Sequence, residues 1–191
     1  DAKGKLLHQI LTIAGHPCNA ITSVYFNQDT VGTRTAVTGT ANDGLVTTGT
    51  YTNLAWVRGY TGSQTAVDYI LNAADSSFWT SSHIGYGLTY AALTFKLDDK
   101  VYASGKPEVA FEVEGKKCYD PRLDSSPGAN PTNASYIAYT TNPALQLADY
   151  LMDANLGRGI AAAKIDWTLV VAAANECDEL VSIPGSTTQK R

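Results

Sequence analysis

The chain has 191 residues and a formal net charge of −4, and only 17% of its residues are charged. It carries no basic stripe, which argues against direct binding of nucleic acid, and no apolar run near the ~18 residues of a membrane helix. Thr, Ser, Asn, Gly and Tyr must therefore supply much of the polar surface, a composition typical of proteins rich in strands and loops.

A chain of this length forms one domain by default. We expect that domain to span residues 1–185 and the tail, residues 186–191, to be disordered. The sequence starts at Asp1 and not at Met, and both ends stop beside well-formed elements. This predicts a processed product or a fragment of a larger protein.

The first half of the chain favours β-strands. Dense or alternating apolar residues predict strands at 5–14, 20–27, 54–60 and 88–97. The stretch 33–52 is rich in Thr, Gly, Ala and Asn and has little to bury, so it predicts a long hairpin or an exposed arm. Residues 64–73 carry apolar side chains at helical spacing, with Ser63 as the expected N-cap.

The second half adds a helix after the alternating strand at 109–114. Asn142 followed by Pro143 is a strong helix start, because Asn is a preferred N-cap and Pro a preferred first residue. We expect this helix to run to about Asp153. The residues expected to face inward are Leu147, Tyr150 and Leu151.

A last helix is predicted from Trp167 to about Val181, with Asp166 as its cap. Its apolar face is expected to hold Trp167, Val170, Val171, Ala174, Cys177 and Val181. Because strands come early and helices late, the predicted fold class is α+β. We expect one or more antiparallel β-sheets with two or three helices packed on one side, joined by long loops.

Motifs for common chemistries are missing from the sequence. It has no nucleophile elbow, P-loop, zinc-protease motif or EF-hand loop. The histidines are far apart along the chain: His8, His16 and His83. The cysteines are odd in number with no C-x-x-C pair, which favours free thiols packed as small hydrophobic groups: Cys18, Cys118 and Cys177. We therefore predict no catalytic residue, no metal site and no cofactor.

Two weaker candidates remain open. Glu112 and Glu114 share one strand face, which a glycosidase-like carboxylate pair could use, but a solvated strand face is the favoured interpretation. An aromatic platform for sugars could form from Trp56, Tyr60 and Trp79. Core packing is favoured for Trp56, which lies in a strand, whereas Trp79 lies in a loop rich in Ser and Thr.

The stretch Tyr119-Asp120-Pro121-Arg122 is the polar cluster with the sharpest local geometry, because Pro121 forces Asp120 away from the helical region. We interpret it as a structural corner. Asp120 should accept hydrogen bonds from nearby backbone or from Arg122, and Tyr119 should pack. The corner leads into the long loop 123–140.

Several motifs occur in an order that resembles the phage tail tip attachment, or host-specificity, protein J family. These stretches are Gly15-His16-Pro17, residues 24–27, residues 78–83, the alternating residues 91, 93 and 95, residues 115–122, residues 141–145, residues 147–151, residues 165–167 and residues 172–179. The resemblance covers roughly residues 5–185, and the run from Gly115 through Arg122 to Asn142-Pro143 is its most specific part. Cys18 and Cys118 stand where the family usually has Val, and the loop 123–140 is longer than the family's connection.

The resemblance implies a structural role. The protein J family forms a trimeric hub at the tail tip of long-tailed phages, and this chain would be a domain inserted in the hub region. It would act in the virion tail tip through contacts with other copies of the parent hub protein and with other tail-tip proteins, without being an enzyme. The alternative is a carbohydrate- or receptor-binding module. The residues expected to form a contact surface are Trp79, Asp124, Asn130, Tyr136 and Tyr139.

Overall fold

The structure is a computed structural model that describes residues 4–31, 42–126, 129–182, 185 and 188–190. The chain forms two compact units, Asp1–Lys116 and Lys117–Arg191. The α+β class predicted from the sequence is confirmed, because antiparallel sheets and three α-helices occur in the described residues. The single domain expected over 1–185 stays a prediction, and each unit is described by itself below.

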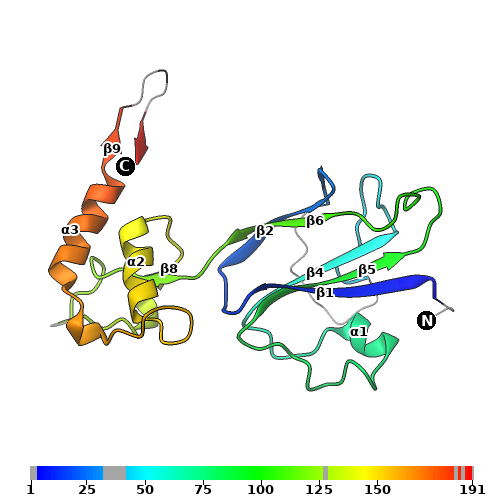
Figure 1. Ribbon diagram of the computed structural model, residues 1–191, viewed down its shortest axis with the longest axis horizontal. Helices are drawn as coiled ribbons and strands as arrows, with labels where there is room; N and C mark the ends of the chain where they lie inside the picture. The colour runs from blue at the N-terminus through cyan, green and yellow to red at the C-terminus, as the bar shows by residue number, and fades with distance from the viewer. Residues whose placement is uncertain (1–3, 32–41, 127–128, 183–184, 186–187, 191) are drawn as a thin grey trace. The chain divides into compact units, whose positions relative to one another are not determined.

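The first unit contains two three-stranded antiparallel sheets (Figure 1). One sheet has the order β1 (Leu6–Ala14), β5 (Thr89–Lys96), β4 (Ala55–Thr61). The other has the order β3 (Asp29–Thr30), β2 (Ala20–Phe26), β6 (Val109–Glu114). All the strands predicted in this part of the chain are therefore present.

The main core of this unit fills the space between the two sheets. Its buried members are Ile21, Val24, Phe26, Val31, Val46, Tyr51, Ala55, Val57, Ala91, Leu93 and Phe95. The central strand β5 is buried on both faces except at its last residue, Lys96. This explains why apolar residues occupy both of its alternating sets of positions.

The opposite face of the β1–β5–β4 sheet is covered by helix α1 (Tyr69–Ala74) and by the loop that follows it (Figure 1). The buried cluster there joins Tyr60, Leu71, Tyr90 and Ala92, with Ile10 and Trp79 packed against it. The rings of Tyr60 and Tyr90 stack with their centroids 4.6 Å apart. Unit 1 is thus layered as sheet, sheet, helix and loop.

Helix α1 begins later than the sequence predicted, and its cap is Asp68 instead of Ser63. Gln64 explains the difference, because its side chain accepts from the backbone N–H of Gly62 and donates to the carbonyls of Gly85 and Leu88. These bonds hold the segment before Asp68 against a neighbouring loop. A helix that started at Gln64 would break these hydrogen bonds.

The stretch predicted as a long hairpin or an exposed arm, 33–52, falls partly on 32–41, which lies outside the described residues. The arm is wrong for the described part, because Val46 and Tyr51 are buried in the main core, whereas Leu45 pairs antiparallel with Trp56 as in a hairpin. Val46 also exchanges backbone hydrogen bonds, donating to Ala55 O at 2.9 Å and accepting from Asn53 N at 2.8 Å. Gly44 permits this close approach: its φ is +73°, and a Cβ there would lie 2.1 Å from the carbonyl oxygen of Val57.

The second unit combines two helices with short strand pairs. Helix α2 spans Pro143–Met152 and helix α3 spans Trp167–Asp178. The paired strands are β7 (Cys118–Tyr119) with β8 (Ile137–Ala138), and β9 (Leu180–Val181) with β10 (Gln189–Lys190). The unit also has two 3₁₀ turns. Ala134–Tyr136 comes directly before β8, and Ala162–Lys164 lies between α2 and α3.

The core of this second unit is small. Cys118, Leu145 and Ala174 are the buried members of its hydrophobic cluster, with Ala144 and Val170 packed against them, and Tyr119 and Ala148 are also buried. The three cysteines of the chain are free thiols, as predicted, and Cys118 acts as an apolar filler. No helix in the described part of the chain is long and apolar enough to cross a membrane.

The end of the chain differs from the predicted tail. Residues 186, 187 and 191 lie outside the described residues, but Gln189 and Lys190 form β10. Helix α3 ends at Asp178, three residues before the predicted end at Val181, because Leu180 and Val181 pair with β10 instead.

Candidate functional site

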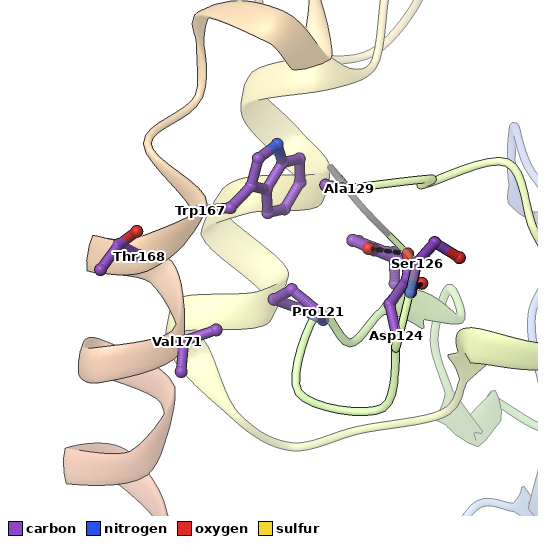
Figure 2. A pocket seen from close by; sticks show the side chains of 8 residues that line it. Pro121, Asp124, Ser126, Ala129, Trp167, Thr168 and Val171 are labelled. Atoms are coloured by element: carbon purple, nitrogen blue, oxygen red, sulfur yellow. Dashed lines mark hydrogen bonds between the residues drawn. The ribbon is translucent and has the colours of Figure 1, made fainter.

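The candidate site lies in the second unit, where the corner, the long loop and the start of α3 surround a pocket of about 330 Å³ (Figure 2). Its lining residues are Tyr119, Pro121, Asp124, Ser126, Ala129, Trp167, Thr168 and Val171. Figure 2 shows Trp167, Thr168 and Val171 coming from α3, and Asp124 and Ser126 from the loop. The pocket is therefore formed by segments that are far apart in the sequence.

The polar side of this pocket is held by Asp124. Its carboxylate accepts hydrogen bonds from the Tyr119 hydroxyl at 2.6 Å, from Ser126 N at 2.8 Å and from Asn130 N at 2.9 Å. These bonds, that of Tyr119 first, hold the pKa of Asp124 well below its usual range. Burial and then the bond to Asp124 raise the pKa of Tyr119 to about 12. At neutral pH the pair is a phenol donating to a carboxylate.

The apolar side of the pocket is held by Trp167. Its ring meets Tyr119 edge to face, with centroids 5.2 Å apart and an interplanar angle of 89°. Its Nε1 donates to the carbonyl oxygen of Ala162 at 3.0 Å. The indole donor is thus already used within the protein, which fixes the ring as a wall.

The structural corner connects the loop to the end of α3 through Arg122. The guanidinium donates to both carboxylate oxygens of Asp120, to Asp178 Oδ2 at 2.8 Å and to the carbonyl of Ala174 at 3.3 Å. Cations are stabilised at helix C-termini, so the position suits an arginine. The expectation that Asp120 accepts from Arg122 and from the backbone is confirmed, since Arg122 N also donates to it at 3.0 Å.

Asn142 connects the same end of α3 to the start of α2. Its Oδ1 accepts from Ala144 N and Leu145 N, which confirms the predicted N-cap, and Pro143 is the first helical residue. Its Nδ2 donates to Ala174 O at 2.8 Å. Ala174 O is therefore the acceptor that Arg122 and Asn142 share, and it fixes the corner and both helices in one arrangement.

The inward face predicted for α2 is wrong for two of its three residues. Leu147 is 58% exposed and Tyr150 is 49% exposed, whereas Leu145 and Ala148 are buried. Leu145 packs with Ala174 of α3, and the bond from Asn142 Nδ2 to Ala174 O joins the start of α2 to the same residue of α3. Leu169 on α3 is also 65% exposed. Large apolar side chains are thus uncovered on both helices.

The predicted contact residues fall in both units of the chain. Asp124 and Asn130 are hydrogen-bonded to each other, and Tyr136 lies where the loop returns, its carbonyl accepting from Asp120 N at 2.9 Å. Tyr139 is exposed just beyond β8. Trp79 belongs to the first unit. The loop 123–140 is thus folded back onto the corner over its described part.

The structure adds no support for the carboxylate pair or for a site formed by the histidines. Glu112 lies on the exposed face of β6, and Glu114 accepts a hydrogen bond from the Asn19 side chain. The histidines form no shared site: His8 contacts Thr94, His16 contacts the Pro17 carbonyl and His83 contacts Thr80. Among the residues that the structure describes, no three His, Cys, Asp or Glu side chains gather where they could hold a metal ion.

Sequence reasoning missed the buried pair of Arg58 and Asp68 in the first unit. Arg58 Nε lies 2.5 Å from Asp68 Oδ2, and both side chains are fully buried. The available signal was a charged residue inside an apolar strand, followed ten positions later by an Asp at a helix start. It also missed that His8, in β1, lies next to Trp79 in a pocket.

A scan against protein-family models finds no match to this chain, and no curated protein matches it either.

Proposed function

We propose that the chain is a structural module of a phage tail-tip hub protein, working in tail assembly, host attachment and DNA delivery through protein–protein contacts. The sequence support is the ordered set of motifs that resembles the protein J family, above all Gly115 to Arg122 followed by Asn142-Pro143. Those residues are the ones that build the corner and the α2 start in the second unit.

One observation carries the proposal: the helical unit leaves large apolar side chains uncovered. Leu147 and Tyr150 on α2 and Leu169 on α3 are each about half exposed or more. A contiguous patch of exposed apolar side chains is typical of surfaces that contact another protein, and the two packed helices of this unit supply three such side chains. The expected partners are other copies of the parent hub protein, as a trimer in the full-length context, and other tail-tip proteins.

The polar groups of the second unit support a scaffold role over a catalytic one. Asp120, Arg122 and Asp178 are engaged with one another, and Asp124 is engaged by Tyr119 and by backbone N–H groups. Such a frame holds its helices in place before a partner binds, which lowers the entropy lost on association.

The test is the location of the polypeptide in a phage lysate. Tail particles from the source culture are purified by density gradient, and antibodies raised against this chain are applied in electron microscopy. We expect the polypeptide to co-sediment with the particles and the label to lie at the tail tip. Detection in cell fractions without virions, and on no particle, would refute the proposal.

A further inference from the structure

A second pocket, of about 240 Å³, lies in the first unit between β1, α1 and the loop after α1. Apolar side chains of the strand and the helix form its base. Four further side chains line it: His8, Asp75, Phe78 and Trp79. The volume is below the roughly 300–1,000 Å³ of pockets for drug-sized ligands, which suits a ligand of a single ring.

Two of these side chains have a buried nitrogen that lacks a partner. Nε2 of His8 and Nε1 of Trp79 are both buried and make no hydrogen bond within the described residues. Buried polar atoms are nearly always paired, so an unpaired one calls for an explanation. Here two such atoms belong to residues that line the same pocket, and a ligand oxygen is the group that would satisfy them.

The indole nitrogen of Trp79 is a donor, whereas the role of His8 Nε2 is set by the tautomer of the ring. In the tautomer that suits a ligand oxygen, Thr94 Oγ1 accepts from Arg58 Nη2 at 3.3 Å and donates to His8 Nδ1 at 3.0 Å. Burial, and then the charge of Arg58, lower the pKa of His8, so the ring is neutral at pH 7. A neutral imidazole that accepts at Nδ1 carries its proton on Nε2.

The loop that presents the aromatic rings is already fixed. Asp75 Oδ1 accepts from Ser77 N at 3.0 Å, from the Ser77 hydroxyl at 2.6 Å and from Phe78 N at 3.2 Å. The Trp79 ring stacks on His83 with centroids 4.8 Å apart and an interplanar angle of 27°. Phe78 is nonetheless 78% exposed, and its ring stacks on no other aromatic ring among the residues that the structure describes.

We propose that this pocket binds one neutral pyranose residue of a glycan. The C–H face of the sugar packs on the aromatic rings, and its hydroxyl oxygens accept from the N–H groups of Trp79 and His8. The loop's own bonds use Oδ1 of Asp75, so Oδ2 can accept from a sugar hydroxyl. These loop bonds, that of the Ser77 hydroxyl first, also lower the pKa of Asp75, which stays ionised and disfavours acidic sugars.

The test follows the indole N–H signals of the ¹⁵N-labelled chain by NMR. The probes are neutral methyl glycosides (gluco, galacto, manno and N-acetylglucosamine), with cyclohexanol as a ring of similar size and one hydroxyl. We expect at least one glycoside to shift the Trp79 signal saturably, at millimolar concentrations. The chemical shift of the Trp167 indole N–H should not change, because this N–H already donates to the carbonyl oxygen of Ala162.

Matched variants separate the pocket from general aromatic exposure. Phe78→Ala removes the exposed ring and should weaken the glycoside about tenfold. Tyr86→Ala removes a ring that is equally exposed, at 76%, in the same unit but outside the pocket, and should leave affinity unchanged. The proposal is overturned if no glycoside moves the Trp79 signal, if cyclohexanol binds as tightly, or if the two variants behave alike.

Discussion

The carboxylate of Asp68 accepts hydrogen bonds from three groups in the interior of the first unit. Its Oδ2 accepts from Arg58 Nε at 2.5 Å and from the Tyr60 hydroxyl at 2.8 Å, and its Oδ1 accepts from Leu71 N at 2.9 Å. Burial, followed by the nearby carboxylate, raises the pKa of Tyr60. One side chain thus ties strand β4 to the first turn of α1.

Replacing Asp68 by Ala should lower the free energy of unfolding by about 3–5 kcal/mol, because Arg58 would remain as a buried charge without its partner. Urea denaturation followed by tryptophan fluorescence measures this. Asp99→Ala, at an exposed position in the same unit, should change stability by less than about 0.5 kcal/mol. Equal losses in the two variants would mean that the buried pair does not support the fold.

Asp120 and Asp178 should make the second unit sensitive to acid. Lys190 first, and then Arg122, lower the pKa of Asp178 to about 2. Burial alone would raise the pKa of Asp120, but its hydrogen bonds from Arg122 outweigh this and lower it. A carboxyl whose pKa is lower in the folded state stabilises the fold above its unfolded pKa of about 3.9, and this contribution disappears as the pH falls toward the folded value.

We therefore expect hydrogen exchange of the α2 and α3 amides to accelerate as the pH falls from about 4 to about 2, after correction for intrinsic rates. Arg122→Gln should reduce stability by about 1–2 kcal/mol at pH 7 and should flatten this pH dependence. A pH dependence that is unchanged in Arg122→Gln would show that the acid sensitivity comes from other groups.

The elements of this fold differ in how far the sequence predicts them. Helix α2 starts where Asn142-Pro143 indicates, because the cap is local chemistry. The start of α1 and the inward face of α2 were predicted wrongly, because both depend on distant partners. Gln64 bonds to Gly85 and Leu88, and Asn142 bonds to Ala174. Periodicity within one element carries no information about such bonds.

The two functions of Asn142 can be separated by substitution. Asn142→Ala should destabilise the chain by about 2–3 kcal/mol, since it removes the cap of α2 and the bond to Ala174 O. Asn142→Asp keeps an oxygen for the cap but replaces the donor by a buried carboxylate facing Ala174 O, near Asp178, so its loss should equal or exceed that of Asn142→Ala. Thermal unfolding followed by circular dichroism ranks the variants, and a clearly higher unfolding temperature for Asn142→Asp than for Asn142→Ala would contradict the role assigned to the bond with Ala174 O.

At the scale of the whole molecule, the sequence indicated strands early and helices late, and the two compact units follow this in the main: the long strands lie in the first unit and the two longer helices in the second, while α1 and the short strands β7 to β10 depart from it. The first unit has a large core between two sheets, whereas the second has three buried residues in its cluster. The sequence could not show which apolar residues stay uncovered, because Leu145 and Leu147 are the same residue type on one helix. The proposed contact role rests on that difference.

Site-specific photo-cross-linking in assembled tail particles tests this role most directly. A photoreactive phenylalanine analogue replaces Leu147 or Leu169 on the helical unit, and Leu97, which is similarly exposed in the first unit, as the control. We predict cross-links to another tail-tip polypeptide or a second copy of the parent protein from positions 147 and 169, and markedly fewer from position 97. Particles that show no cross-link from positions 147 and 169, or equal yields from all three, would contradict the account.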